Sequence, residues 1–195
     1  MSALPQHTMT VEEFVVWSEA QPREAGRFEL WDGQIVVKHG AAGEMNAERS
    51  QHWKMKAAIY RAFYAAFMTS GLAGDVVIDG ASVRLLNDRL VEPDVLVYLG
   101  PELPPDVLVV PDPIIVCEVL SPATAKFDMS VKLEGYFGLP SIHHYIIADP
   151  DKPLLIVHSR GAANVHQTRI VSDSRQPLVL DPPGLRIDLA DIFGG

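Results

Sequence analysis

Residues 113–137 have the sequence PIIVCEVLSPATAKFDMSVKLEGYF, and the rest of the chain is organised around them. The first part, Ile114–Leu120, is apolar except for Glu118, which is typical of a strand buried on both faces of a sheet. A carboxylate in such a strand is costly to ionise unless a cation or a hydrogen-bond donor compensates it. A short amphipathic helix is expected from about Asp128, and it presents Lys132. A strand that contains an acid is therefore followed at once by a helix that contains a lysine.

Length and composition predict one soluble domain that spans residues 1–195. The chain has 48% hydrophobic residues, enough for a sizeable core. It has no apolar run of membrane-spanning length, and residues 1–14 lack the basic and apolar segments of a secretory signal. The single cysteine, Cys117, lies in the buried run and is expected to be a small core residue. These features favour a reducing cytoplasm and no membrane partner.

The net charge of −9 argues against a general nucleic-acid binder. A local basic surface and a bound metal ion could still allow an acidic protein to hold nucleic acid. The charge therefore lowers the expectation of nucleic-acid binding without removing it.

Two Asp-Gly dipeptides predict tight turns in the first half of the chain. Residues 27–38 predict a β-hairpin around Asp32-Gly33, because Asp-Gly suits a type I′ turn. Residues 75–86 predict a second hairpin around Asp79-Gly80.

The remaining chain completes an alternation of helices and strands. Thr10 and Glu13 form the sequence signature of a capping box, which begins a helix that ends near Ala20. Further strands are expected at residues 143–148, 154–158 and 165–171, and the tail at 181–193 adds a short edge or capping segment.

Polar residues in the first hairpin and the longest helix leave alternatives open. Glu29 alternates with apolar neighbours and is expected to be a solvated or sheet-edge carboxylate. In the helix predicted at 45–68, Glu48 and His52 project onto the core-facing stripe. They meet a polar partner, lie where the core opens into a cleft, or belong to a frayed, partly exposed first turn. Lys56 is one of several basic residues there, suited to phosphate contact or to ordinary solvation.

A carboxylate pair is predicted where two strands meet. If the strand from Val95 to Leu99 is antiparallel to the one ending near Leu120, Asp94 lies beside Glu118. Two close carboxylates repel, so they share a proton or bind a cation. Oxygen ligands of this kind favour Mg²⁺ or Mn²⁺. Lys132 beside the pair could orient a water molecule and stabilise charge on a phosphate.

These motifs resemble those of a known nuclease group. Pro93-Asp94, followed after a hydrophobic run by Glu118-Val119-Leu120, resembles the bipartite motif of the PD-(D/E)xK nuclease superfamily. The longer pattern resembles a bacterial putative restriction endonuclease family, expanded in cyanobacteria and formerly a domain of unknown function. It consists of EPDVLVY from Glu92, EVLSPAT from Glu118, then Asp128, Lys132, Tyr136 and HYIIADP ending at Pro150. Residues Glu48, Arg49, His52 and Lys56 are similar to its proteobacterial branch.

The chain departs from the superfamily pattern at one important position. The motif places lysine two residues after Glu118, where this chain has Leu120. The resemblance implies that Lys132 supplies the missing ammonium, and a flexible lysine stem makes this physically feasible. Alternatively, Lys132 is only the i+4 partner of Asp128 on an exposed helix. The resemblance also suggests Glu48 as a third carboxylate.

The resemblance implies an α/β fold with a restriction-endonuclease-like core, in which helices flank a central mixed β-sheet. It implies a Mg²⁺- or Mn²⁺-dependent endonuclease that hydrolyses DNA, with Asp94, Glu118 and Lys132 as catalytic residues, the two carboxylates as metal ligands, and a homodimer as the family-level expectation. One alternative is a non-catalytic nucleic-acid-binding or protein-interaction module that kept the fold. Another is a hydrolase of small phosphoesters.

Overall fold

The computed structural model describes residues 4–22, 25–39, 50–86, 88–121, 130–161, 166–172 and 175–194. Its centre is a six-stranded sheet in the order β10-β9-β8-β7-β6-β3. The strands are β3 (Gly74–Ile78), β6 (Val95–Leu99), β7 (Pro113–Val119), β8 (His144–Asp149), β9 (Leu154–Arg160) and β10 (His166–Val171). The strands predicted from the central stretch, from residues 95–99 and from the later segments are all present, with ends that shift by one or two residues.

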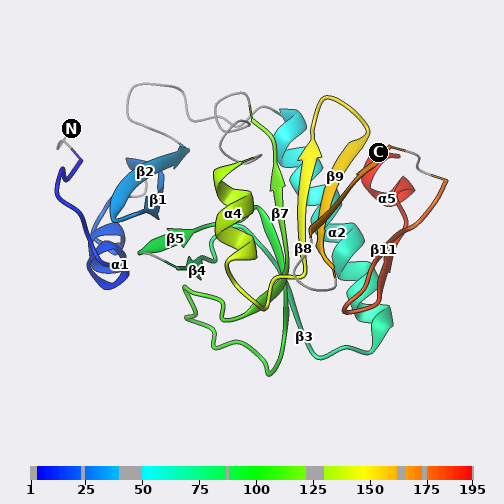
Figure 1. Cartoon of the computed structure of the whole chain (residues 1–195), viewed down its shortest axis with the longest axis horizontal. Coiled ribbons are helices and arrows are strands. Elements are labelled where there is room, and N and C mark those ends of the chain that lie inside the picture. The colour runs from blue at the N-terminus through cyan, green and yellow to red at the C-terminus, as the bar shows by residue number, and fades with distance from the viewer. Residues whose placement is uncertain are drawn as a thin grey trace.

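The sheet is mixed because one connection in it is a helical crossover. Strands β7 and β8 are parallel, and α4 (Val131–Phe137) lies between them in the chain. Strand β6 is antiparallel to β7, as predicted. The remaining neighbours in this sheet also pair antiparallel. Figure 1 shows β7 at the middle of the molecule with α4 beside it.

Alternate residues of the central strands pack into two separate cores, one on each face of the sheet. On one face, Ile115 and Cys117 of β7 pack with α2 (Ser50–Ser70). On the other, Val116 packs with Tyr136 and neighbouring residues of α4. Cys117 is fully buried, as predicted for a small core residue, and burial raises the pKa of its thiol. A strand covered on both faces explains the nearly continuous apolar run of β7.

A second, four-stranded sheet lies on the α4 side of the molecule in the order β2-β1-β5-β4. Its strands are β1 (Arg27–Trp31), β2 (Gln34–His39), β4 (Val83–Leu85) and β5 (Arg89–Val91). Helix α1 (Val11–Glu19) begins with the predicted capping box of Thr10 and Glu13, and its Phe14 packs with Leu30 of β1 (Figure 1).

One of the two predicted hairpins is confirmed and the other is wrong. Strands β1 and β2 pair around Asp32-Gly33, where both residues have positive φ angles of 49° and 75°. Asp79 and Gly80 also have positive φ angles, but β3 belongs to the central sheet and β4 to the second sheet. The Asp-Gly turn at Asp79 therefore passes the chain between sheets, because a turn signal fixes local direction and not the partner of the next strand.

The C-terminal tail forms a packed unit on the α2 face. It consists of β11 (Leu178–Leu180), β12 (Leu185–Ile187) and α5 (Ala190–Phe193). Strands β11 and β12 pair antiparallel, and Leu180, Leu185 and Ile192 are buried in the same core as α2. The tail therefore covers the hydrophobic core on the α2 face of the sheet.

Helix α2 extends from Ser50 to Ser70 in the described part of the chain, whereas the prediction placed a helix at 45–68. Residues 45–49 of that prediction lie outside the described residues. No helix of the described residues is long and apolar enough to span a membrane.

Candidate active site

The sheet register brings the two predicted carboxylates to the same end of two adjacent strands. Val95 of β6 pairs with Cys117 of β7, so Asp94 and Glu118 occupy the next position on each strand. Asp94 Oδ2 accepts a hydrogen bond from the backbone N–H of Val119 at 2.8 Å. Both carboxylate residues are buried, at 1% and 2% exposure. The antiparallel pairing inferred from the sequence therefore places Asp94 beside the Glu118 segment.

Cations and polar groups from three elements surround Asp94. Lys38 Nζ lies 3.2 Å from Oδ1 and Lys56 Nζ lies 3.4 Å from the same oxygen. His52 Nε2 lies 3.8 Å from Oδ2 and 2.9 Å from the carbonyl oxygen of Val119. Burial by itself would raise the pKa of Asp94, but the ammonium groups of Lys38 and Lys56 outweigh it and hold that pKa well below its usual range. Asp94 is thus a buried carboxylate that stays ionised at neutral pH.

Glu118 has its described partners in helix α4. Lys132 Nζ donates to Glu118 Oε1 at 2.8 Å, and the Tyr136 hydroxyl donates to the same oxygen at 2.7 Å. Burial and the negative charge of Glu118 raise the pKa of Tyr136, so the phenol stays protonated as a donor. The helix expected after the central strand therefore aims Lys132 and Tyr136, one turn apart, at Glu118.

Glu29 lies within the candidate site, and its prediction as a solvated or edge carboxylate is wrong. It is 2% exposed and accepts hydrogen bonds from Lys132 Nζ at 3.2 Å and from the backbone N–H of Glu92 at 3.0 Å. Burial alone would raise the pKa of Glu29, but Lys132 and Lys38 lower it on balance. Strand alternation correctly placed Glu29 opposite Leu30. Strand alternation could not show that helix α4 covers the face to which Glu29 points.

Two further lysines reach the site, and the sequence did not identify either as part of a carboxylate cluster. Lys56 lies one turn after His52 on the buried face of α2, a spacing that could have indicated a shared environment. Its Nζ lies 3.0 Å from Asp79 as well as near Asp94. Lys38 comes from the end of β2, and no local pattern in the sequence marks it. Solvation, one of the two readings considered for Lys56, is excluded because its side chain is 3% exposed.

Two predicted site residues, Glu48 and Asp128, lie outside the described residues. His52 is described, and it meets polar partners, which was one of its predicted alternatives. For Lys132, the described partners are Glu29 and Glu118 in the interior of the protein.

The donor atoms at the site match the chemistry of a hard divalent cation. Asp94 and Glu118 offer carboxylate oxygens from adjacent strands, which is the ligand type that Mg²⁺ and Mn²⁺ prefer. Among the described residues, no group of three or more His, Cys, Asp or Glu side chains is arranged to hold a metal ion. The described residues thus supply a pair of carboxylates, and further oxygen ligands, such as water or a phosphate oxygen, would complete the coordination.

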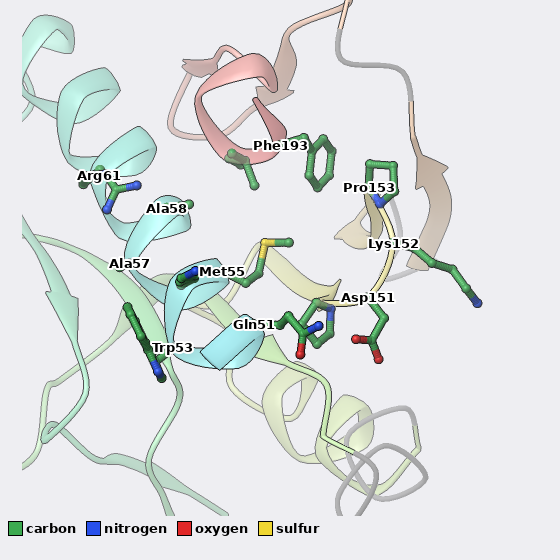
Figure 2. A pocket seen from close by; sticks show the side chains of 13 residues that line it. Gln51, Trp53, Met55, Ala57, Ala58, Arg61, Asp151, Lys152, Pro153 and Phe193 are labelled. Carbon is green, nitrogen blue, oxygen red and sulfur yellow. The ribbon is translucent and has the colours of Figure 1, made fainter. Parts of the chain in front are cut away.

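A cavity of about 570 Å³ lies along α2, and its described lining includes none of the carboxylates and lysines of the site. The cavity is lined by Gln51 and Met55 of α2, by the turn that follows β8, and by Phe193 of α5 (Figure 2). Because β7 and β8 are parallel, this turn lies at the same sheet edge as Val119. The cavity also includes Trp53, Lys54 and Arg61 of α2.

Comparison with known proteins gives a family match and a structural match. The model of the Uma2 family, described as "Putative restriction endonuclease", matches residues 11–190. The crystal structure of a putative nuclease belonging to DUF820 from Anabaena variabilis superimposes with a TM-score of 0.70 at 14% sequence identity, covering 95% of this chain and 98% of that chain. This likeness confirms the predicted fold class, a central mixed sheet flanked by helices. No curated protein matches the sequence.

Proposed function

Because the chain belongs to the Uma2 family of putative restriction endonucleases, we propose that it is a metal-dependent endonuclease that hydrolyses DNA phosphodiester bonds. The observation that supports this most strongly is the pair Asp94 and Glu118, buried at the ends of adjacent strands and surrounded by lysines. Ionised carboxylates in the interior are costly, and such groups are concentrated at functional sites.

In this proposal Asp94 and Glu118 hold Mg²⁺ or Mn²⁺. When bound, such an ion polarises a phosphate oxygen and lowers the pKa of a coordinated water molecule. The protein orients the first ligand through the hydrogen bond from the Val119 backbone N–H to Asp94. Tyr136 orients the second ligand by donating to Oε1 of Glu118.

Lys132 provides the ammonium that the superfamily motif places where this chain has Leu120. Glu29 and Glu118 hold Lys132 Nζ from two sides, at 3.2 and 2.8 Å. A fixed ammonium next to a metal-binding carboxylate can stabilise the negative charge that develops on the scissile phosphate. Glu29 acts through Lys132 and is a positioning residue.

The outer surface of α2 suits contact with the DNA chain. Trp53 is 51% exposed, and Lys54 Nζ lies 5.8 Å from its ring centroid. Arg61 lies on the same side of the helix and lines the same cavity (Figure 2). Basic groups bind phosphates and an exposed aromatic ring stacks on bases, which gives an acidic protein a local surface for nucleic acid.

A second candidate is a nucleic-acid-binding module that kept the nuclease fold without cleavage. The observation that favours it is that lysines already neutralise both carboxylates, while the position of the motif lysine has become Leu120. Such a protein would bind DNA with no dependence on a divalent cation.

Plasmid nicking by the purified protein tests the proposal. Supercoiled DNA should be nicked with Mg²⁺ or Mn²⁺ and remain intact with a chelator. Glu118→Gln should abolish nicking, whereas Glu134→Gln, at an exposed position of α4, should leave it unchanged. Absence of metal-dependent cleavage of supercoiled, linear and single-stranded DNA by the wild type would reject the enzyme and favour the binding module.

A further inference from the structure

Lys38 is a buried cation next to the carboxylate pair. Its side chain is 5% exposed, and its Nζ lies 3.2 Å from Asp94 Oδ1. It also donates to the backbone carbonyl of Glu92. The ammonium group is thus held in the interior by one carboxylate and one carbonyl oxygen. Asp94, one of the two proposed metal ligands, therefore contacts this ammonium group directly.

The backbone around Lys38 is irregular in a way that directs the side chain. Phe28 of β1 pairs with Val37, whereas Arg27 pairs with His39. Lys38 is therefore the extra residue of a β-bulge. Bulges turn a side chain away from its regular direction and are frequent next to active sites. The bulge accounts for how a residue at the end of a hairpin strand reaches Asp94, 56 positions later in the chain.

Among the described side chains of the site that are at most 5% exposed, the charges balance before any metal ion is added, and the more exposed Asp79 pairs with Lys56 from outside this group. Three ammonium groups (Lys38, Lys56 and Lys132) face three carboxylates (Glu29, Asp94 and Glu118), and each of these side chains is at most 5% exposed. A divalent cation would add two positive charges in a medium where like charges repel strongly. Movement of one ammonium group away from the carboxylates would lower the cost of adding that cation.

The partners of the three lysines differ, and they single out Lys38. Lys132 is held by two buried carboxylates, Glu29 and Glu118. Lys56 is held by Asp79 in addition to Asp94. Lys38 has Asp94 as its carboxylate partner and otherwise a neutral carbonyl group. It has the smallest number of charged contacts to lose among these described pairs.

We propose that the Lys38 ammonium occupies the cation position of the Asp94–Glu118 pair, and that a divalent ion displaces it toward a phosphate oxygen of the bound substrate. The inference rests on the proposed function for the identity of the incoming cation. Lysine suits this exchange because its charge is at the end of a flexible four-carbon stem. Lys38 would thereby keep the carboxylates ionised and apart from each other until the metal ion arrives, and then add a positive charge near the substrate.

Calorimetric titration with Mn²⁺ tests the exchange without requiring catalysis. Lys38→Met removes the competing ammonium and keeps the length of the stem, so it should bind Mn²⁺ about tenfold or more tightly than the wild type, within the usual range of coupling between competing ligands. Lys54→Met, on the exposed face of α2, should bind as the wild type does. If folded Lys38→Met binds Mn²⁺ as tightly as the wild type or more weakly, the inference is overturned. Weaker binding is the result expected if Lys38 only holds the site in shape, because its loss would then loosen the carboxylates.

A second measurement follows the wild-type protein and does not require Lys38→Met to fold. With lysine labelled with ¹³C at Cε, the Lys38 resonance, assigned by comparison with Lys38→Arg, should shift as Mg²⁺ is added, while the Lys54 resonance stays in place. A Lys38 signal that does not respond at metal saturation would reject the exchange. Tighter Mn²⁺ binding by Lys38→Met in a protein that never nicks DNA would support the exchange and reject the nuclease, so the two failures are distinguishable.

Discussion

Lys132 Nζ lies 2.8 Å from Glu118 Oε1, and both side chains are 3% exposed. The two residues are 14 positions apart and belong to consecutive elements, β7 and α4. The ion pair therefore connects the central strand to the helix that covers it. Because it is buried, it contributes as part of a charge cluster and not as a solvent-screened surface pair.

Lys132→Met should impair both stability and cleavage. The substitution leaves Glu29 and Glu118 buried without their shared ammonium, which should lower the free energy of unfolding by about 3 kcal/mol. Loss of one preorganised charge should lower the cleavage rate by on the order of 10²-fold. Urea unfolding and the initial rate of plasmid nicking measure the two effects. Full activity in folded Lys132→Met would remove the residue from the mechanism.

Adding Glu29→Gln to Lys132→Met should restore part of the lost stability, since only one buried carboxylate then lacks a cation. The double variant should remain as slow as Lys132→Met. Recovery of the cleavage rate together with stability would show that Lys132 acts only on folding.

Glu29→Gln alone should lower kcat and leave KM for DNA nearly unchanged. The amide keeps the shape of the side chain but weakens its hold on Lys132, whose position matters mainly in the transition state. We expect a smaller loss than in Lys132→Met, about tenfold at most. Steady-state kinetics on a labelled oligonucleotide measure the two constants. An unchanged kcat would contradict the positioning role.

Gly74→Ala should destabilise the central sheet strongly. At Gly74, with a φ angle of 143°, an added Cβ would lie 2.0 Å from the backbone oxygen of Tyr98 on the paired strand β6. Backbone atoms cannot move aside cheaply, so the free energy of unfolding should fall by at least about 2 kcal/mol. Gly71→Ala is the matched control, because its φ angle is also positive but nothing lies within 4 Å. It should cost about 1 kcal/mol.

Protonation of His144 should make the protein less stable as the pH falls from about 6.5 to 4. The imidazole is buried, and burial lowers its pKa from 6.5 to about 4 despite a hydrogen bond to the Pro182 carbonyl. In this window the unfolded chain binds a proton that the native state excludes, so stability is lost on acidification, by on the order of 2 kcal/mol. Urea unfolding at pH 7, 5.5 and 4 measures this. If the free energy of unfolding falls with pH as steeply in His144→Gln as in the wild type, His144 is not the group responsible.

Trp53→Ala with Arg61→Ala should weaken DNA binding without affecting the metal site. Loss of one stacking ring and one phosphate contact should raise Kd about tenfold or more at moderate salt. Fluorescence anisotropy with a labelled duplex measures binding, and Mn²⁺ calorimetry should give the wild-type affinity. Arg84→Ala, an exposed cation that pairs with Glu12 away from α2, is the control. Unchanged DNA binding would show that the α2 surface is not used.

Local patterns in the sequence were sufficient for the central part of the fold and for half of the site. The apolar run of β7 required a strand covered on both faces, and the proline-bounded strand before it supplied the antiparallel neighbour. These two facts placed Asp94 beside Glu118. The amphipathic helix after β7 then placed Lys132 within reach, because the contact spans only 14 positions.

Only the tertiary structure decided which other charges complete the site. Glu29 meets Lys132 across 103 positions of the chain, and Lys38 meets Asp94 across 56. Alternation in a strand shows that two faces exist, but what covers each face depends on how distant segments dock. The same limit explains the error at Asp79, where the turn was predicted but the sheet of the next strand was not. The sequence by itself thus determined the strand that contains the acid and the helix that presents Lys132, whereas the docking of the second sheet added Glu29 and Lys38 to the site.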